Sequence, residues 1–259
     1  MPTGIGAGIA GRVFGNKCGD TNPPKVCEDL YSCKFIQREP NNQWLNNNRS
    51  PLSIGQNGLE NFTIAFWIKL DTTSTGTEQG VISWGSGNDP KMQIYLLSNG
   101  AGFQFNMSNA NDGGNTWNDG TGIINPPINT WIHYAYVVDR ETDPVDMTGT
   151  WFQNGISIGS KNAAFPVATN DMNFPVGDNY FFGRRQSLPG TQSLQGNLDD
   201  FTIWNKALTS AEILELMDVS QKRENCMDDL SFYSKITHWW EMGDNHVPPG
   251  PSTFPTIVD

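Results

Sequence analysis

The chain has 259 residues, 37% of them hydrophobic, and a formal net charge of −11. This length suits one large β-sandwich, and the apolar fraction can fill its core. The acidic balance would repel a phosphate backbone, which argues against nucleic-acid binding, and no apolar run is long enough for membrane insertion.

Aromatic residues, glycine and proline dominate the composition, with 9 Trp, 14 Phe, 6 Tyr, 27 Gly and 16 Pro. Aromatic side chains favour pleated, half-buried surfaces, while glycine and proline punctuate them. The composition therefore predicts many strands joined by many turns.

Residues 1–33 read as an extended, glycine-rich arm with no cationic segment of the kind that opens a signal peptide. Its cysteines follow a C-x8-C-x5-C spacing, which is not that of a zinc site. The four cysteines of the chain allow three disulfide connectivities or four free thiols, and both states stay open. They are Cys18, Cys27, Cys33 and Cys226.

Regular alternation begins after the arm. In FTIAFWIKL (62–70), every second side chain is strongly apolar, which predicts a strand with one buried face. Further strands are expected at 81–84, 92–97, 103–107, 131–139, 180–183 and 198–204. Asn154-Gly155, between two apolar runs in 150–160, predicts a hairpin turn. Trp67 and Trp84 are expected to fill the interior.

A long polar loop is expected at 108–130, between the strands at 103–107 and 131–139. It contains one aromatic residue among polar ones, a composition that suits contact with a glycan or a protein. The candidate ligand-binding residues are Asn115, Trp117, Asn118 and Asp119.

One helix is expected, running from Thr209 to about Val219. Thr209 and Glu212 have the spacing of a capping box, and Leu208 and Ile213 that of the hydrophobic staple around it. Ile213, Leu216 and Met217 would form its buried stripe. A last strand is expected around Ile236–Trp240, before a Pro-rich end.

Strands at this density predict an all-β fold, a two-sheet antiparallel β-sandwich with one short helix and extended termini. The expected organisation is an arm at 1–33, a sandwich at 34–224 and a tail at 225–259.

Four segments together resemble the laminin-G-like branch of the concanavalin A-like lectin/glucanase jelly rolls. They are FTIAFWIKLD, TWIHYAYVVDRET, TWFQNGISIGS and GNLDDFTIWNKALTSAEILEL, and the resemblance covers about residues 33–220. The resemblance implies a jelly roll. Asp199 and Asp200 lie in the "LDD/E" signature, and the resemblance implies that they cap backbone groups or contact the neighbouring strand.

The tail segment ITHWWEMGDNHVPPGPSTFPTIVD is similar to a "WWRMGDGD…PTITD" segment of virion proteins from tailed bacteriophages, with Glu241 in place of the arginine. With the arm, this resemblance implies a virion location, and a secreted, extracellular protein is the alternative.

No cofactor is predicted, and calcium is the one ion considered. A calcium site needs about six oxygen ligands converging from several loops. The candidates are Asp112, Asn118, Asp119, Asp139 and Asp199.

A catalytic role is not expected. Retaining glycosidases need two carboxylates about 5 Å apart, and the nearest string, 141–146, is interrupted by Pro144 and lies in a loop. His133 is expected to be a packed strand residue and not a base.

The sequence therefore predicts a non-enzymatic structural or decoration protein of a virion. Its arm and tail would bind capsid or tail proteins, or further copies in a homo-oligomer. The alternative is a module that binds surface glycans, and a glycoside hydrolase is the remote one.

Overall fold

The computed structural model describes residues 33–35, 37–38, 41–42, 45–47, 61–73, 76–86, 89–108, 116–119, 126–140, 146–164, 179–185, 193–222, 227 and 230–240. Most of the predicted arm, the Pro-rich end, Cys18, Cys27 and Cys226 lie outside these residues, as do the calcium candidate Asp112 and the ligand-binding candidate Asn115.

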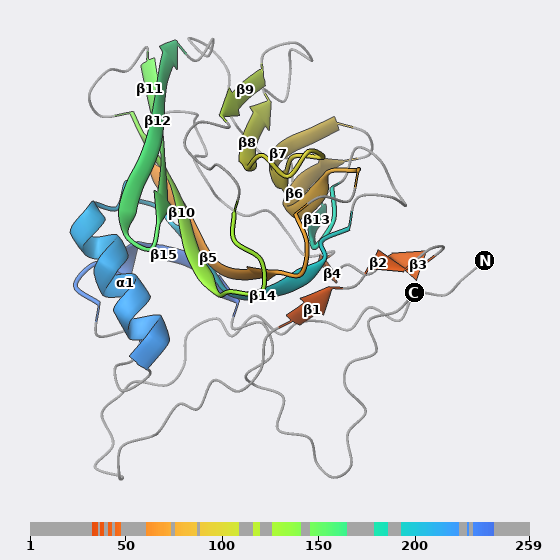
Figure 1. Ribbon diagram of the computed structural model, residues 1–259. Coiled ribbons are helices and arrows are strands. Elements are labelled where there is room, and N and C mark those ends of the chain that lie inside the picture. The colour runs from red at the N-terminus through yellow and green to blue at the C-terminus, as the bar shows by residue number, and fades with distance from the viewer. Residues whose placement is uncertain are drawn as a thin grey trace.

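Two antiparallel sheets face each other (Figure 1), which confirms the predicted sandwich. The larger sheet has seven strands: β1 (Cys33–Phe35), β14 (Gly196–Trp204), β5 (Phe62–Leu70), β10 (Ile132–Asp139), β11 (Asp146–Gln153), β12 (Ile156–Ala164) and, paired with β14, β15 (Ile236–Trp240). The smaller has six: β4 (Leu45–Asn47), β13 (Asn179–Phe182), β6 (Gln79–Ser86), β7 (Asp89–Leu96), β8 (Phe103–Ser108) and β9 (Thr116–Asp119). A separate two-stranded ribbon joins β2 (Gln37–Arg38) to β3 (Asn41–Asn42).

The first hydrophobic core fills the space between the sheets. Strand β5 lies in the middle of the larger sheet, and its apolar face points inward as the alternation predicts. Phe66 stacks on Phe201 of β14 at 5.6 Å and meets Phe103 of the smaller sheet edge-on at 6.3 Å. Such aromatic contacts across the sandwich fix how the two sheets pack against each other.

A second core lies on the outer face of the larger sheet, where helix α1 (Ser210–Lys222) packs against it (Figure 1). Ile213 and Leu216 of the helix are buried there with Trp204 of β14. The segment before β15, including the short 3-10 helix η2 (Tyr233–Lys235), completes this core with Leu230 and Phe232.

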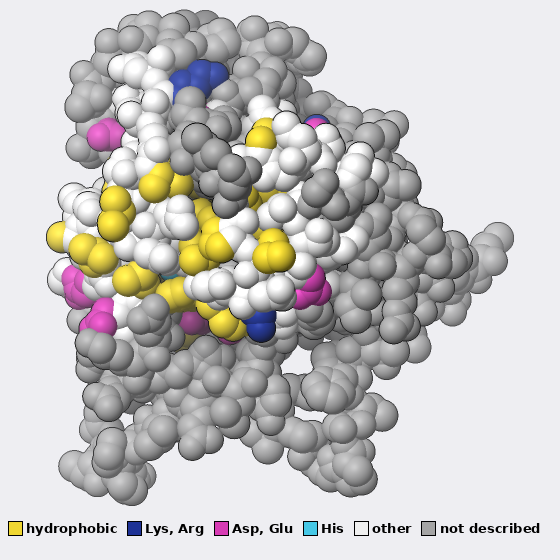
Figure 2. Space-filling view, in the orientation of Figure 1, with side chains coloured by type: hydrophobic (Ala, Val, Ile, Leu, Met, Phe, Trp, Pro, Cys, Tyr) yellow, Lys and Arg dark blue, Asp and Glu magenta, His cyan; other side chains and the backbone are white. Residues whose placement is uncertain are grey.

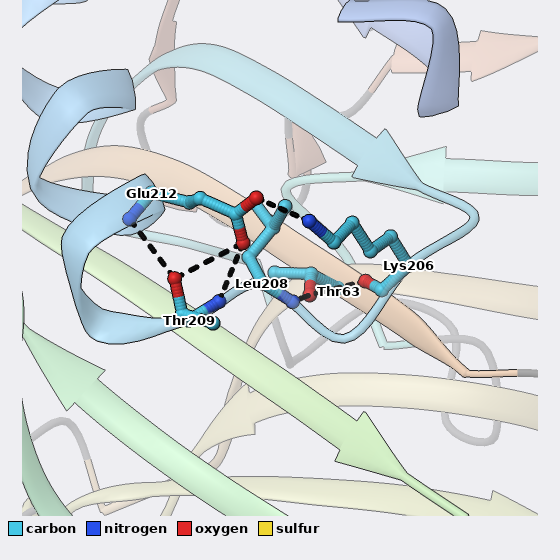
Figure 3. A network of polar contacts seen from close by, with 5 residues as sticks. All are labelled: Thr63, Lys206, Leu208, Thr209 and Glu212. Atoms are coloured by element: carbon cyan, nitrogen blue, oxygen red, sulfur yellow. Dashed lines mark hydrogen bonds and ion pairs between the residues drawn. The ribbon is translucent and has the colours of Figure 1, made fainter. Parts of the chain in front are cut away.

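The start of α1 is fixed by the predicted capping box (Figure 3). The backbone N–H of Glu212 donates to Thr209 Oγ1 at 3.3 Å, and the N–H of Thr209 donates to Glu212 Oε2 at 2.9 Å. Glu212 also pairs with Lys206. Thr63 of β5 ties this region to the sheet, because its hydroxyl accepts from Leu208 N at 3.0 Å.

The predicted hairpin turn is also confirmed. Asn154 and Gly155 both have positive φ, 49° and 76°, as a two-residue turn of this kind requires. It connects β11 and β12, and the Asn154 N–H donates to the carbonyl of His133 at 2.8 Å.

Three details differ from the sequence-based expectation. The polar segment 108–130 was expected to be all loop, but it contains β9 at the edge of the smaller sheet, where the strand pairs with β8. Trp131 precedes β10 and is 37% exposed, so it is not part of the central strand. Trp84 is in the core as expected, whereas Trp67 lies on the outer face, half-buried beside His133.

Within the described part of the chain, no helix has both the length and the apolar character needed to cross a bilayer.

Candidate functional site

The predicted ligand-binding segment ends in the interior. The Asp119 side chain is fully buried, and its Oδ2 accepts a hydrogen bond from Tyr136 Oη at 2.9 Å. Strand β9 aligns Trp117 with Met107 and Asn118 with Asn106. A ligand contact by Asp119 would break a buried hydrogen bond, so the prediction for this segment rests on Asn115, Trp117 and Asn118.

The two aspartates considered as metal ligands are far apart. Asp199 on β14 is opposite Trp67 on β5, and Trp67 is opposite His133 on β10. Asp139 lies six residues beyond His133 along β10. At about 3.3 Å per strand residue, this offset is about 20 Å. One ion cannot bind both, and no group of three or more His, Cys, Asp or Glu side chains suited to a metal occurs among the described residues.

A β-bulge in β14 lies between Asp199 and Thr202, where the pairing with β5 shifts. Asp199 Oδ1 accepts from the Asp200 N–H at 2.9 Å, which supports the positive φ of 39° at Asp200. Asp200 Oδ1 accepts from Trp239 Nε1 at 3.0 Å. Asp199 therefore stabilises the bulge, and Asp200 stabilises the join between β14 and β15, which agrees with the structural role that the signature implies.

His133 lies beside this bulge on the outer face, and its side chain is 2% exposed. Burial lowers the pKa of the imidazole to about 3, so the ring is neutral at physiological pH. It meets Trp67 edge-on at 5.2 Å, and its Nδ1 has no hydrogen-bond partner among the described residues. A neutral, enclosed ring agrees with the prediction of a packed strand residue.

The accessible part of this face lies at the end of the sheet where β5 finishes and β10 begins. Residues 127–131 are exposed, and two of them are large hydrophobic residues, Ile128 at 48% and Trp131 at 37%. The Asn129 N–H donates to the carbonyl of Leu70 at 2.7 Å, and Ile128 forms a parallel bridge with Leu70. The loop thus holds its apolar side chains outward from a fixed backbone.

Polar side chains lie next to Trp131. Trp131 directly precedes Ile132, which is opposite Ile68, so continuing this register by one residue brings Trp131 level with Lys69. Lys69 is opposite Asn197 on β14. Both are half-buried. We call Trp131, Lys69 and Asn197 the Trp131 face.

An exposed indole beside a cationic donor and an amide suits a ligand that has both apolar and hydrogen-bonding surfaces. The ring offers a flat apolar platform, and the neighbouring groups offer donors and an acceptor that fix orientation. A sugar ring, with C–H groups on its faces and hydroxyls at its rim, has this character.

Sequence reasoning missed the Trp131 face because WIHYAYVVD reads as one continuous strand. The turn residues Pro126, Pro127 and Asn129 mark the end of the loop, but no local signal separates Trp131 from the strand that follows it. The partners Lys69 and Asn197 come from strands far away in sequence, and their meeting depends on the order of strands in the sheet.

The fold is a β-sandwich of the lectin-like kind. The family model described as the concanavalin A-like lectin/glucanases superfamily matches residues 40–214. The chain belongs to this superfamily, as its four sequence signatures suggested. A search of curated proteins found no match.

Solved structures show the same fold. A native heptameric SAP-like pentraxin from Limulus polyphemus is 15% identical with a TM-score of 0.50, over 71% of this chain and 78% of the pentraxin chain. A Bacteroides ovatus protein whose assigned role is carbohydrate binding is 15% identical with a TM-score of 0.51, over 81% of this chain and 51% of its own. The chain thus spans about half the length of the second protein, and at these identities the likeness concerns the fold alone.

Proposed function

We propose that this chain is a non-catalytic glycan-binding module and that the Trp131 face is its binding site. The observation that carries the proposal is the exposed Trp131 on a fixed loop, beside Lys69 and Asn197, in a fold of the lectin superfamily. Trp131 keeps 37% of its surface exposed on a rigid support, which leaves the indole ring available for stacking.

The charges around the Trp131 face favour a neutral glycan. Lys69 is the one cation of the face, whereas Asp199 and Asp71 are neighbouring carboxylates on β14 and at the end of β5. The whole chain has a formal charge of −11. An anionic polysaccharide would meet net repulsion, whereas hydroxyl groups can accept from Lys69 and donate to Asn197.

The hydrogen bonds that occupy the buried carboxylates support a binding role over hydrolysis. Glycoside hydrolysis needs two carboxylates facing a cleft, one of which must accept or deliver a proton. Asp199 and Asp200 hold the bulge and Trp239, and Asp119 is bonded to Tyr136 inside the sandwich.

A glycan array that contains neutral and acidic polysaccharides tests the proposal. We expect binding to one or more neutral glycans, and Trp131→Ala should reduce it at least tenfold because stacking on the ring is lost. The matched control is Ile156→Ala, which removes an exposed hydrophobic side chain at the β11–β12 hairpin, outside the face. A blank array, or binding that Trp131→Ala leaves unchanged, would refute the site.

The setting of this module is a separate proposal. The tail resemblance favours a virion, where the chain would contact capsid or tail proteins, and a secreted location is the alternative. A glycan-binding module on a particle would serve adhesion to the host, which reconciles the two hypotheses. Mass spectrometry of purified particles tests it, and absence of the chain from them would leave the secreted alternative.

A further inference from the structure

Strand β5 carries a second indole on the outer face of the larger sheet, at Trp67. Its neighbours Phe66 and Ile68 point inward and belong to the core between the sheets. Trp67 itself is half-buried, and neither of the two cores that the described residues form includes it. A tryptophan outside the cores, on a strand in the middle of a sheet, keeps part of a large apolar ring for another contact.

The strand register places Trp67 next to the Trp131 face. Trp67 and Lys69 are two residues apart on β5, so their side chains lie on the same side of the sheet. Asn197 is opposite Lys69, which makes it a diagonal neighbour of Trp67 on β14. Trp131 is level with Lys69 on the other side, so it is the diagonal neighbour of Trp67 on the β10 side. Diagonal neighbours are about 7–8 Å apart, which aromatic side chains can span.

The Trp67 ring is supported by a buried neighbour. His133 is opposite Trp67 on β10, and the two rings meet at 5.2 Å with an interplanar angle of 61°. The imidazole is 2% exposed, and the backbone N–H of His133 donates to Asn154 Oδ1 at 3.0 Å. An enclosed ring on a tied backbone limits the rotation of the indole that it touches. A side chain that is already ordered loses little conformational freedom when a ligand binds.

The accessible surface around Trp67 is limited on one side only. The next outward positions of β5 and β10 are Ala65 and Ala135, which are opposite each other and fully buried in the second core. In the other direction, residues 127–131 are exposed. Hydrophobic side chains gather over the part of the molecule in which β5 and β10 lie (Figures 1 and 2). A ligand can therefore begin at Trp67 and continue past Trp131 into solvent.

We propose that Trp67 is a second stacking platform and that the site binds a two-ring segment of a neutral glycan, whose remaining units leave past Trp131. This inference rests on the proposed glycan-binding function and adds the length of the ligand. One sugar ring stacks on each indole, and Lys69, which adjoins both, donates to oxygen atoms near the linkage. A single sugar occupies one platform, and a chain longer than two rings gains no further stacking.

The full chain can be titrated by calorimetry with unbranched oligosaccharides of one to six units, in separate series of glucose, mannose, galactose and N-acetylglucosamine. For a series that binds, we expect the Kd to fall roughly tenfold or more from monosaccharide to disaccharide, and less than about threefold from disaccharide to hexasaccharide. Trp67→Leu should abolish the first gain and leave monosaccharide binding unchanged, and Trp67→Phe should keep part of the gain. Trp131→Ala should weaken binding at every length, and Ile156→Ala is the matched control that should bind normally.

Failure of this inference differs from failure of the proposed function. If no oligosaccharide binds, or if Trp131→Ala leaves binding unchanged, the proposed function is wrong and the inference is overturned with it. If binding needs Trp131 but is equally tight for monosaccharide and disaccharide, or if both Trp67 variants bind the disaccharide as the native chain does, the inference alone is wrong. A Kd that keeps falling up to the hexasaccharide would overturn the two-ring limit.

Discussion

At the scale of single residues, two neighbouring tyrosines of β10 occupy different polar environments. Tyr136 Oη donates to the buried carboxylate of Asp119, whereas Tyr134 Oη is buried and has no partner among the described residues. Removing a hydroxyl that satisfies a buried charge should cost stability, but removing an unsatisfied one should not.

Tyr136→Phe should therefore lower the free energy of unfolding by about 1–3 kcal/mol, while Tyr134→Phe should be neutral or slightly stabilising. Both variants keep the ring contacts of the core, so each serves as the other's control. Urea denaturation followed by tryptophan fluorescence measures the difference. Equal losses in the two variants would contradict the assigned hydrogen bond.

His133 should make stability depend on pH. Its pKa is about 3 in the folded chain, against an ordinary value near 6.5 in the unfolded one, so the unfolded state binds the extra proton first. Stability is lost as the pH falls from 6.5 towards 3, and the loss at pH 4.5 should be about 3 kcal/mol. His133→Asn should reduce the difference in unfolding free energy between pH 7 and pH 4.5 by about this amount. An unchanged difference would mean that the imidazole is not enclosed as described.

At the scale of elements, Thr63 joins the central strand to the segment before α1. Its hydroxyl accepts from the buried N–H of Leu208 and donates to the carbonyl of Lys206 at 2.7 Å (Figure 3). This one side chain therefore fixes the path of the segment that connects the end of β14 to the start of α1, and it ties that segment to β5.

Thr63→Val has the same shape but leaves the Leu208 N–H without its partner. It should destabilise the fold by about 1–3 kcal/mol, and Thr63→Ser, which keeps the hydroxyl, should lose clearly less. Thermal unfolding by circular dichroism measures both. If serine and valine are equally destabilising, the methyl packing and not the hydrogen bonds holds the helix.

The elements themselves follow from local patterns, which is why most of them could be predicted. Alternation placed β5, the Asn154-Gly155 pair placed the hairpin, and Thr209 with Glu212 placed the start of α1. Strand β9 was missed because TWND has no apolar alternation, and the strand is fixed by pairing with β8. The Trp131 face was missed for a related reason, since strand order brings its three residues together.

At the scale of the whole molecule, the larger sheet is shared by two cores, and the last described segment contributes to both. Trp240 of β15 lies in the core between the sheets, 5.2 Å from Phe182. Leu230, Phe232 and Ile236 lie in the core beneath α1. The family match ends at residue 214, yet the fold of this chain continues to Trp240.

A chain that ends at Lys222 should therefore not fold cooperatively. Loss of Trp240 alone should cost about 3–5 kcal/mol, as in a buried Trp→Ala change, and the truncation also uncovers the second core. Domains of this kind have only about 5–15 kcal/mol of stability in total. Differential scanning calorimetry should show a sharp transition for the full chain and for the exposed-site control Trp131→Ala, a lower one for Trp240→Ala, and none for the truncated chain. A truncated chain that melts as sharply and at the same temperature as the full one would show that β15 is an addition to a finished sandwich and not part of its cores.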